Sequence, residues 1–220
     1  ERRSKKEPIQ YIINNAWFYG REFYVNKNVF IPRPESERLI EEAINYLRDF
    51  DSPKILEIGT GSGCLSISLA IEFPNSDVQS IDISGNAINV AKINSKKFNV
   101  NNISFKKLDF LKSGMKTFYN FDLLISNPPY IPKKDMESLM PEVRNFEPHS
   151  ALTDNNDGLE FYRKLSSDLP YILNSNGIGI FEVGLSPHPK NAKRIFNKIG
   201  RSIKLLKDYN GDDRLLIVKL

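Results

Sequence analysis

From residue 54 to the end of the chain, short apolar segments alternate with longer segments whose apolar residues recur at helical spacing. The short segments predict buried strands, and the longer ones predict amphipathic helices. This order predicts an α/β fold, in which a mostly parallel seven-stranded sheet is covered by helices on both faces. The expected strands comprise residues 54–58, 77–81, 103–107, 121–126, 177–183, 203–208 and 214–220, and the expected helices comprise residues 63–73, 84–98, 158–173 and 188–199.

Two other segments predict antiparallel hairpins. Asn210-Gly211 separates the last two expected strands, and this dipeptide favours a tight turn, so one reversed strand is expected in the sheet. Residues 16–31 alternate apolar and polar around Gly20, which predicts a short N-terminal β-hairpin. Residues 35–50 carry apolar side chains at helical spacing. We therefore expect an N-terminal extension of residues 1–33 packed on a main domain of residues 34–220.

A glycine-rich stretch follows the first of these strands. Glu57 lies near the end of the strand, which runs directly into Gly59-Thr60-Gly61-Ser62-Gly63. Glycines allow a sharp turn and close approach of a ligand, and the helix that follows offers free N–H groups. The third glycine of a dinucleotide fingerprint would fall at Cys64, and the Gly-Lys-Ser/Thr ending of a P-loop is missing. The spacing is typical of S-adenosylmethionine (SAM) enzymes, although a simple connecting turn is the alternative.

Acidic residues close the next two expected strands. Asp82 follows the glycines by just over 20 residues, where a carboxylate can accept both hydroxyls of a ribose. Helix capping is its alternative role, but Ser84 is better placed for that. Asp109 and Phe110 follow the third strand and are candidates to bind an adenine amino group and to pack on its ring. A turn aspartate and a core phenylalanine explain these two residues nearly as well.

Asn127-Pro128-Pro129-Tyr130 directly follows the apolar strand at residues 121–126. The two prolines cannot continue the strand because they lack an N–H to donate. The chain therefore breaks at the carboxyl end of a strand, where open α/β sheets bind their ligands. An amide side chain, backbone carbonyls and an aromatic ring are suited to holding a planar NH₂ group. A rigid turn capped by Asn127 is the less favoured alternative.

The segment after this motif, residues 131–156, is rich in proline, asparagine and charge. A long segment of this kind in a compact domain predicts a functional loop or lid. Glu147 and His149 are interpreted as ordinary loop residues within it.

Composition narrows the classes of function. The 220 residues are 40% hydrophobic and 26% charged, as in an ordinary globular protein, and the net charge of +4 is too small for a dedicated nucleic-acid binder. The sequence has no apolar run long enough to span a membrane, and no signal peptide is apparent. One cysteine and two histidines predict no disulfide and no metal site. We expect a cytoplasmic protein, or one of an organellar matrix.

Several separate stretches together resemble one family. They are Phe18-Tyr19-Gly20-Arg21-Glu22-Phe23, Ile31-Pro32-Arg33-Pro34-Glu35-Ser36-Glu37, residues 57–63, residues 126–131, Pro141-Glu142-Val143, Phe146-Glu147-Pro148, Asp157-Gly158-Leu159 and Gly211-Asp212-Asp213-Arg214. The chain resembles the protein-(glutamine-N5) methyltransferases of peptide chain release factors, the HemK/PrmC family. The resemblance implies a Rossmann-like class I SAM-dependent methyltransferase. Ser36 departs slightly from the family, in which threonine is usual.

The resemblance implies methyl transfer from SAM to the glutamine amide of the Gly-Gly-Gln motif, leaving S-adenosylhomocysteine, without a metal. The expected catalytic residues are Asn127, Pro128 and Tyr130, which also bind substrate together with Pro129, Arg33 and Glu35. Arg33 and Glu35 would form a rim over cofactor and substrate, or else a solvated charge pair at a helix start. The expected cofactor-binding residues are Glu57, Gly59, Thr60, Gly61, Ser62, Gly63, Asp82, Asp109, Phe110 and Asn127.

The resemblance also implies a release factor as the protein partner of a monomeric enzyme. The family's N-terminal helical docking domain is not found in this sequence. Neither a membrane nor direct binding of nucleic acid is required. Two alternatives stay open: an adenine-N6 methyltransferase of DNA or RNA, whose acceptor is also a planar NH₂ group, and a non-catalytic SAM-binding protein.

Overall fold

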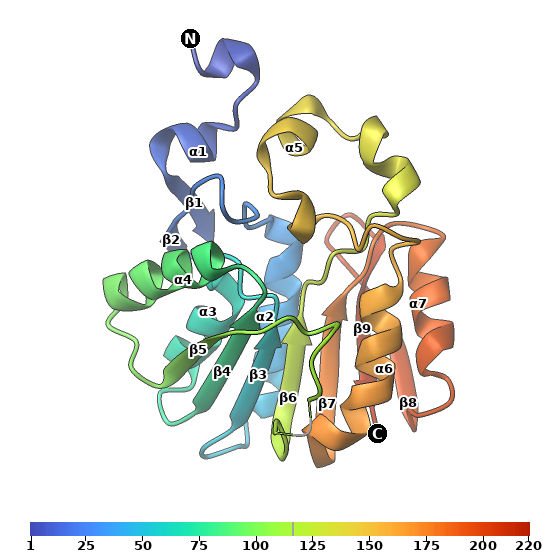
Figure 1. The fold of residues 1–220 in the computed structure, drawn as a ribbon. Helices are drawn as coiled ribbons and strands as arrows, with labels where there is room; N and C mark the ends of the chain where they lie inside the picture. Colours follow the sequence, from blue (N-terminus) through green and yellow to red (C-terminus); the bar gives the residue numbers. More distant parts are fainter. Residues whose placement is uncertain (116) are drawn as a thin grey trace.

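The structure is a computed structural model that describes residues 1–115 and 117–220. Its main sheet has seven strands in the order β5-β4-β3-β6-β7-β9-β8 (Figure 1). Of the seven strands, β9 runs opposite to the other six, so the predicted mostly parallel sheet with a C-terminal antiparallel hairpin is confirmed. The strands are β3 (Lys54–Ile58), β4 (Asp77–Asp82), β5 (Ile103–Lys107), β6 (Phe121–Ser126), β7 (Leu173–Glu182), β8 (Ser202–Lys207) and β9 (Asp213–Lys219).

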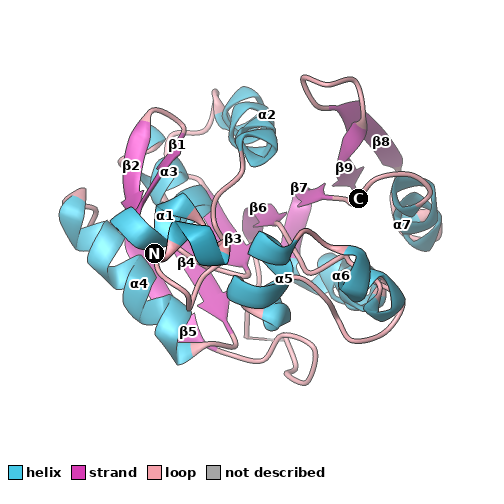
Figure 2. Cartoon of the chain, turned by 90° about the horizontal axis from the view of Figure 1, so that it is seen from above, coloured by secondary structure: helices cyan, strands magenta, loops and turns pink. Residues whose placement is uncertain are grey.

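Helices cover both faces of the sheet (Figure 2). One face carries α2 (Glu37–Leu47), α3 (Cys64–Glu72) and α4 (Gly85–Lys97), and the other carries α6 (Glu160–Ile172) and α7 (His188–Phe196). Ile55 belongs to the core that includes α2 and α3, whereas its neighbour Leu56 belongs to the core that includes α6 and α7. Successive strand residues point to opposite faces, and both faces are buried, which is why these strands are continuously apolar.

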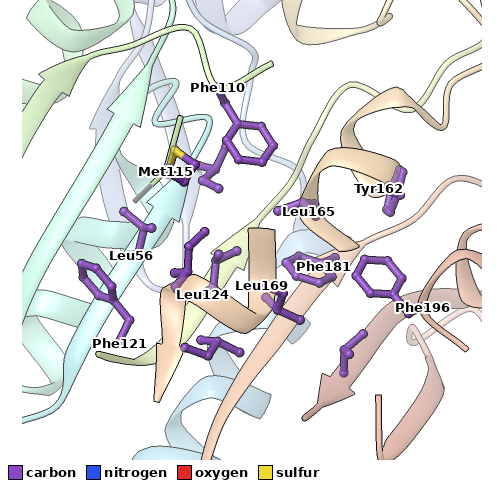
Figure 3. Packing of buried hydrophobic residues seen from close by; sticks show 14 of the residues in the cluster. Leu56, Phe110, Met115, Phe121, Leu124, Tyr162, Leu165, Leu169, Phe181 and Phe196 are labelled. Atoms are coloured by element: carbon purple, nitrogen blue, oxygen red, sulfur yellow. The ribbon is translucent and has the colours of Figure 1, made fainter. Parts of the chain in front are cut away.

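The core beneath α6 and α7 is rich in aromatic rings. Phe181 and Phe196 stack with their ring centroids 5.6 Å apart, and Leu165 and Leu169 of α6 pack beside them (Figure 3). Helix α6 is shorter than the expected helix at residues 158–173, and β7 begins before the expected residue 177, because Leu173 already pairs with Phe121 of β6. This packing fixes the carboxyl end of β7 beside that of β6.

The N-terminal segment forms the expected hairpin, β1 (Asn15–Phe18) and β2 (Arg21–Tyr24). Phe18 and Phe23 are fully buried in the core that α2 and α3 share. The hairpin is preceded by a short helix, α1 (Ile9–Ile13), and by a 3₁₀ turn, η1 (Arg3–Lys5), neither of which the sequence pattern predicts. The residues before α2 therefore pack on the main domain, and the boundary at residue 33 stays a prediction.

The segment after Tyr130 lies above the carboxyl ends of the strands (Figure 1). It contains η3 (Lys133–Ser138), α5 (Pro141–Phe146) and η4 (His149–Ala151), joined by irregular stretches. Its position agrees with the expected lid. None of the helices that the structure describes has the length and apolar character needed to span a bilayer.

Candidate active site

A cavity of about 240 Å³ opens at the carboxyl ends of β3, β4 and β6. It gathers residues from stretches far apart in the sequence, as expected where parallel strands end at one edge. The predicted site residues in its lining are Glu57, Gly59, Thr60, Gly61, Ser62, Asp82, Asp109, Phe110, Asn127 and Pro129. The predicted residues outside this lining are Arg33, Glu35, Gly63, Pro128 and Tyr130.

The glycine loop is held by β4. The amides of Gly59 and Thr60 donate to the Ile81 carbonyl at 2.8 and 3.1 Å. Gly63 has a φ of +80°, and a Cβ there would lie 2.8 Å from Cδ1 of Ile67. Only glycine combines this left-handed conformation with such close packing. Gly63 therefore shapes the turn into α3 and does not itself face the cavity.

Asp82 fastens the loop to the start of α4. One carboxylate oxygen accepts from the Gly61 amide at 2.9 Å and the other from the Ser84 amide at 2.8 Å. Ser84 caps α4, because its Oγ accepts from the Ala87 amide at 3.2 Å, as the sequence predicted. Burial raises the pKa of Asp82, while the two amides oppose this. An ionised carboxylate has about four lone-pair sites, so both oxygens keep capacity for ribose hydroxyls.

Glu57 lies beneath the loop with only 1% of its surface exposed. Its carboxyl group accepts from the Ser80 hydroxyl at 2.6 Å, and Ser80 is 2.7 Å from the Thr60 hydroxyl. Burial raises the pKa of Glu57 to about 8. Glu57 thus links β3, β4 and the glycine loop, and it places an acidic group at the base of the cavity.

Asp109 and Phe110 have structural roles in addition to lining the cavity. Asp109 Oδ1 accepts from the amides of Leu111 and Lys112 at 3.1 and 3.3 Å, as a turn aspartate does. Phe110 is buried (Figure 3). Its ring stacks on that of Phe161 with 6.1 Å between the centroids. Adenine binding by these two residues stays a prediction.

Asn127 is anchored by its amide nitrogen. Nδ2 donates to Oγ of Ser36 at 3.1 Å, and the Ser36 hydroxyl donates to the buried carboxylate of Glu182. Within the described chain, no donor contacts Oδ1 of Asn127 or the carbonyl of Pro128. Both acceptors thus lack a described protein partner; Asn127 lines the cavity, whereas Pro128 is buried and lines neither opening.

Tyr130 lies beyond the cavity and lines a second, wider opening of about 1260 Å³. Its hydroxyl donates to Glu182 at 3.2 Å, and its ring centroid is 5.9 Å from that of His188. A Cβ on Gly158 would lie 2.3 Å from the Tyr130 carbonyl, so backbone also packs tightly against this residue. Burial raises the pKa of Tyr130, and the nearby Glu182 carboxylate adds to this. The motif therefore separates the cofactor-sized cavity from a wider opening.

Arg33 contacts the lid and does not pair with Glu35. Its guanidinium forms an ion pair with Glu147 and lies 4.6 Å from the ring centroid of Phe30, a residue that lines the cavity. Glu147 is 4% exposed and also accepts from the Ile31 amide at 3.4 Å. The interpretation of Glu147 as an ordinary loop residue is wrong, because burial required a charged partner. The half-buried Glu35 lines neither opening.

Comparison with known proteins identifies the family. Residues 49–173 match the family described as "Methyltransferase domain". The release factor glutamine methyltransferase of Fusobacterium nucleatum is 39% identical over 218 residues, which are 99% of this chain and 61% of that protein. The enzyme of the same name from Bacillus cereus is 39% identical over 97% of this chain and 76% of its own length. The chain belongs to the release factor glutamine methyltransferase family.

The fold agrees with membership of this family. A methyltransferase structure from Pyrococcus furiosus superposes with a TM-score of 0.63 at 21% identity, covering 99% of this chain and 97% of that chain. The chain therefore has the class I SAM-dependent methyltransferase fold. It spans 61% of the Fusobacterium protein's length, so it corresponds to part of that relative.

The residues of the cavity fit SAM. Glu57, Asp82 and Asp109 lie at or near the ends of successive strands, and their oxygens can accept from the hydroxyl and amino donors of such a ligand. The loop from Gly59 to Gly61 lets that ligand approach the backbone closely. Over residues 1–115 and 117–220, no group of three or more His, Cys, Asp or Glu side chains is arranged to hold a metal ion.

Three residues at or near the site were not predicted from the sequence: Ser36, Glu182 and Arg214. Ser36 lines the cavity, and Glu182 and Arg214 form an ion pair at 3.4 Å behind Tyr130. The signals were present but weak. Glu182 is an acidic residue at the end of an apolar strand, and Arg214 belongs to the Gly-Asp-Asp-Arg stretch. Neither reveals its partner without the fold.

Proposed function

We propose that this chain transfers a methyl group from SAM to the side-chain amide nitrogen of the glutamine in the Gly-Gly-Gln motif of a peptide chain release factor. The observation that carries the proposal is Asn127, which lines a cavity that fits SAM and whose Oδ1 has no donor among the described residues; the carbonyl of the adjacent Pro128 also has none. The curated relatives are named for the same reaction.

The acceptor amide needs positioning more than it needs a base. Its nitrogen lone pair is delocalised into the carbonyl, so it is a weak nucleophile. Asn127 Oδ1 and the Pro128 carbonyl accept its two N–H bonds, which directs the nitrogen toward the methyl group and stabilises positive charge developing on it. SAM, when bound, supplies a methyl group that is already activated on a sulfonium. The proton of the product leaves to water.

The histidines support this mechanism because neither is poised as a base. Nδ1 of His188 accepts from the Gly184 amide at 3.1 Å, and Nε2 lies 3.0 Å from the Gly158 carbonyl, so both ring nitrogens are engaged. His149 is exposed on the lid, where its Nε2 lies 2.7 Å from the Arg144 carbonyl. Positioning by Asn127 therefore carries the reaction.

The proposal assigns a role to each of the other site residues according to its position around the cavity. Tyr130 packs on the plane of the acceptor amide and excludes water. Asp82 binds the ribose, Asp109 and Phe110 bind the adenine, and the glycine loop and Glu57 hold the remainder of SAM. Pro129 contributes to the wall between cofactor and substrate. Arg33 keeps the lid closed over the cavity through Glu147, while the role of Glu35 at the substrate rim rests on the sequence alone.

The adenine-N6 alternative and the non-catalytic alternative are not favoured. The relatives are release factor glutamine methyltransferases, and the acceptors at Asn127 and Pro128 are intact. The protein acts, in this proposal, as a cytoplasmic or organellar monomer without a metal. A separate docking domain would strengthen binding of the release factor.

Mass spectrometry of a release factor incubated with this chain and SAM tests the proposal. We expect one added methyl group, on the glutamine of the Gly-Gly-Gln motif. A release factor in which this glutamine is replaced by alanine is the matched control and should gain none. Methylation of duplex DNA or ribosomal RNA in a parallel reaction, with none on the release factor, would refute the proposal.

A further inference from the structure

A buried polar network behind the Asn127-Pro128-Pro129-Tyr130 motif is centred on Glu182. Glu182 ends β7, is 1% exposed, and accepts hydrogen bonds from side chains of three separate segments. Ser36 donates to one carboxylate oxygen, and Tyr130 and Arg214 donate to the other at 3.2 and 3.4 Å. A buried carboxylate requires such partners, since an unpaired one would be very unfavourable.

Arg214 forms an ion pair with this carboxylate. Arg214 is a donor that cannot be deprotonated, and Nη2 lies within 3.5 Å of both Glu182 and Tyr130. The charge of Arg214 favours the ionised form of Glu182, opposing the burial that raises the pKa of Glu182. An ionised carboxylate only accepts hydrogen bonds, so the hydroxyls of Ser36 and Tyr130 must both donate to it.

The direction of the Ser36–Glu182 hydrogen bond determines how the Asn127 side chain is oriented. The single proton of the Ser36 hydroxyl is used toward Glu182, so Oγ can only accept from Asn127. The group of Asn127 that faces Ser36 must therefore be the NH₂, at 3.1 Å. The two ends of a carboxamide have almost the same shape, and their orientation is decided by the network around them. The carbonyl end of Asn127 then points away from Ser36.

We infer that Glu182 and Ser36 are positioning residues, which hold the Asn127 side chain so that its oxygen, and not its NH₂ group, is presented to the acceptor amide. The inference rests on the proposed function for the identity of that acceptor. An Asn127 turned the other way would present two N–H donors to an acceptor that also donates, and the acceptor would be repelled. Glu182 also holds the Tyr130 hydroxyl, so one carboxylate orients both side chains of the motif.

Tyr162 keeps Glu182 in place. Its hydroxyl donates to the backbone carbonyl of Glu182 at 2.6 Å, and its ring, which projects from α6, is fully buried (Figure 3). The carboxylate is thus attached to the rigid core of the sheet, as an accurate positioning group requires.

A double-mutant cycle on methyl transfer to a release factor tests the inference. We expect Ser36→Ala to lower kcat/KM for the release factor about tenfold, as for losing one hydrogen bond, while the Kd for SAM stays unchanged. In an Asn127→Ala background, Ser36→Ala should have no further effect, because its target is gone. Ser36→Thr, which keeps the hydroxyl, should restore activity. Equal losses in both backgrounds would indicate a merely structural role and would overturn the inference.

Two further variants complete the test. Ser95→Ala is the matched control, because the buried Ser95 hydroxyl donates to the Val100 carbonyl at 2.9 Å, away from the network, and it should leave kcat/KM unchanged. Glu182→Gln keeps the volume but can donate to Ser36 and so release Asn127. It should lower kcat/KM at least as much as Ser36→Ala does. A Glu182→Gln variant that is folded and fully active would contradict the inference.

NMR of the free protein separates this inference from the proposed function. The Nδ2 protons of Asn127 should be protected from exchange with water in the wild type and should lose this protection in Ser36→Ala. If the wild type transfers no methyl group but this difference in protection is found, the proposed function fails and the positioning by Ser36 is supported. Equal protection in both proteins would overturn the positioning.

Discussion

Replacing Gly158 by alanine tests how tightly the backbone of the Asn127-Pro128-Pro129-Tyr130 motif is packed. Gly158 has a φ of +81°, and an added Cβ would lie 2.3 Å from the Tyr130 carbonyl oxygen and 3.0 Å from its carbonyl carbon. Contacts this short cannot be relieved by rotating a side chain, since both atoms are backbone. The left-handed conformation costs about 1–2 kcal/mol for alanine, and overpacking adds about 1–3 kcal/mol. We expect Gly158→Ala to lower the free energy of unfolding by roughly 2–5 kcal/mol.

Gly20 provides the matched control. It has a φ of +69°, but nothing lies within 4 Å of an added Cβ. Gly20→Ala should therefore lose only the conformational part, about 1–2 kcal/mol. Urea unfolding of both variants gives the difference that is due to the clash. At a temperature where both are folded, methyl transfer should fall in Gly158→Ala alone, because Tyr130 and the Pro128 carbonyl are displaced. Equal stability losses, or full activity in Gly158→Ala, would refute the packing argument.

Three other outcomes are expected. Asn127→Ala should lower the rate of methyl transfer about a hundredfold, as expected for losing one preorganised polar contact. Calorimetry should show that SAM binding is nearly unchanged in this variant. Normal turnover would contradict the mechanism. Asp82→Ala should have the opposite effect: it should raise the Kd for SAM while turnover at saturating SAM stays close to that of the wild type. Glu57 has a raised pKa of about 8, so the folded state binds its proton more tightly than the unfolded state. The stability from this proton is complete below the unfolded pKa and is lost as pH rises through about 8. Between pH 5 and pH 9, the free energy of unfolding measured with urea should therefore fall less in Glu57→Gln than in the wild type. Equal decreases in both proteins would show that Glu57 is not the group responsible.

The lid illustrates a limit of sequence reasoning. Residues 131–156 were expected to be a long functional loop, and their position over the strand ends agrees with this. Glu147 was missed because nothing local distinguishes it from other charged loop residues. Its partner Arg33 is 114 positions away, and the ion pair forms only when the lid and the segment before α2 are brought together.

The lining of the cavity was easier to predict than the expected substrate rim, for a physical reason. The cavity is lined by residues at strand ends and in the glycine loop, whose places follow from local pattern and from the parallel order of the sheet. Arg33 and Glu35 lie on an irregular segment, where no repeating geometry indicates the direction of a side chain. The roles of these two residues therefore stay predictions.

The sheet, the glycine turn and the break at Asn127-Pro128-Pro129-Tyr130 could be predicted from sequence alone, because each depends on short-range properties: short continuous apolar segments, the freedom of glycine and the missing N–H of proline. Tertiary structure decided which end of the Asn127 amide is free. Ser36 is 91 positions from Asn127 and 146 from Glu182, and the hydrogen bonds that join them form only when β6, β7 and the turn before α2 meet. The orientation of a carboxamide depends on its neighbours in space, and the local sequence does not contain that information.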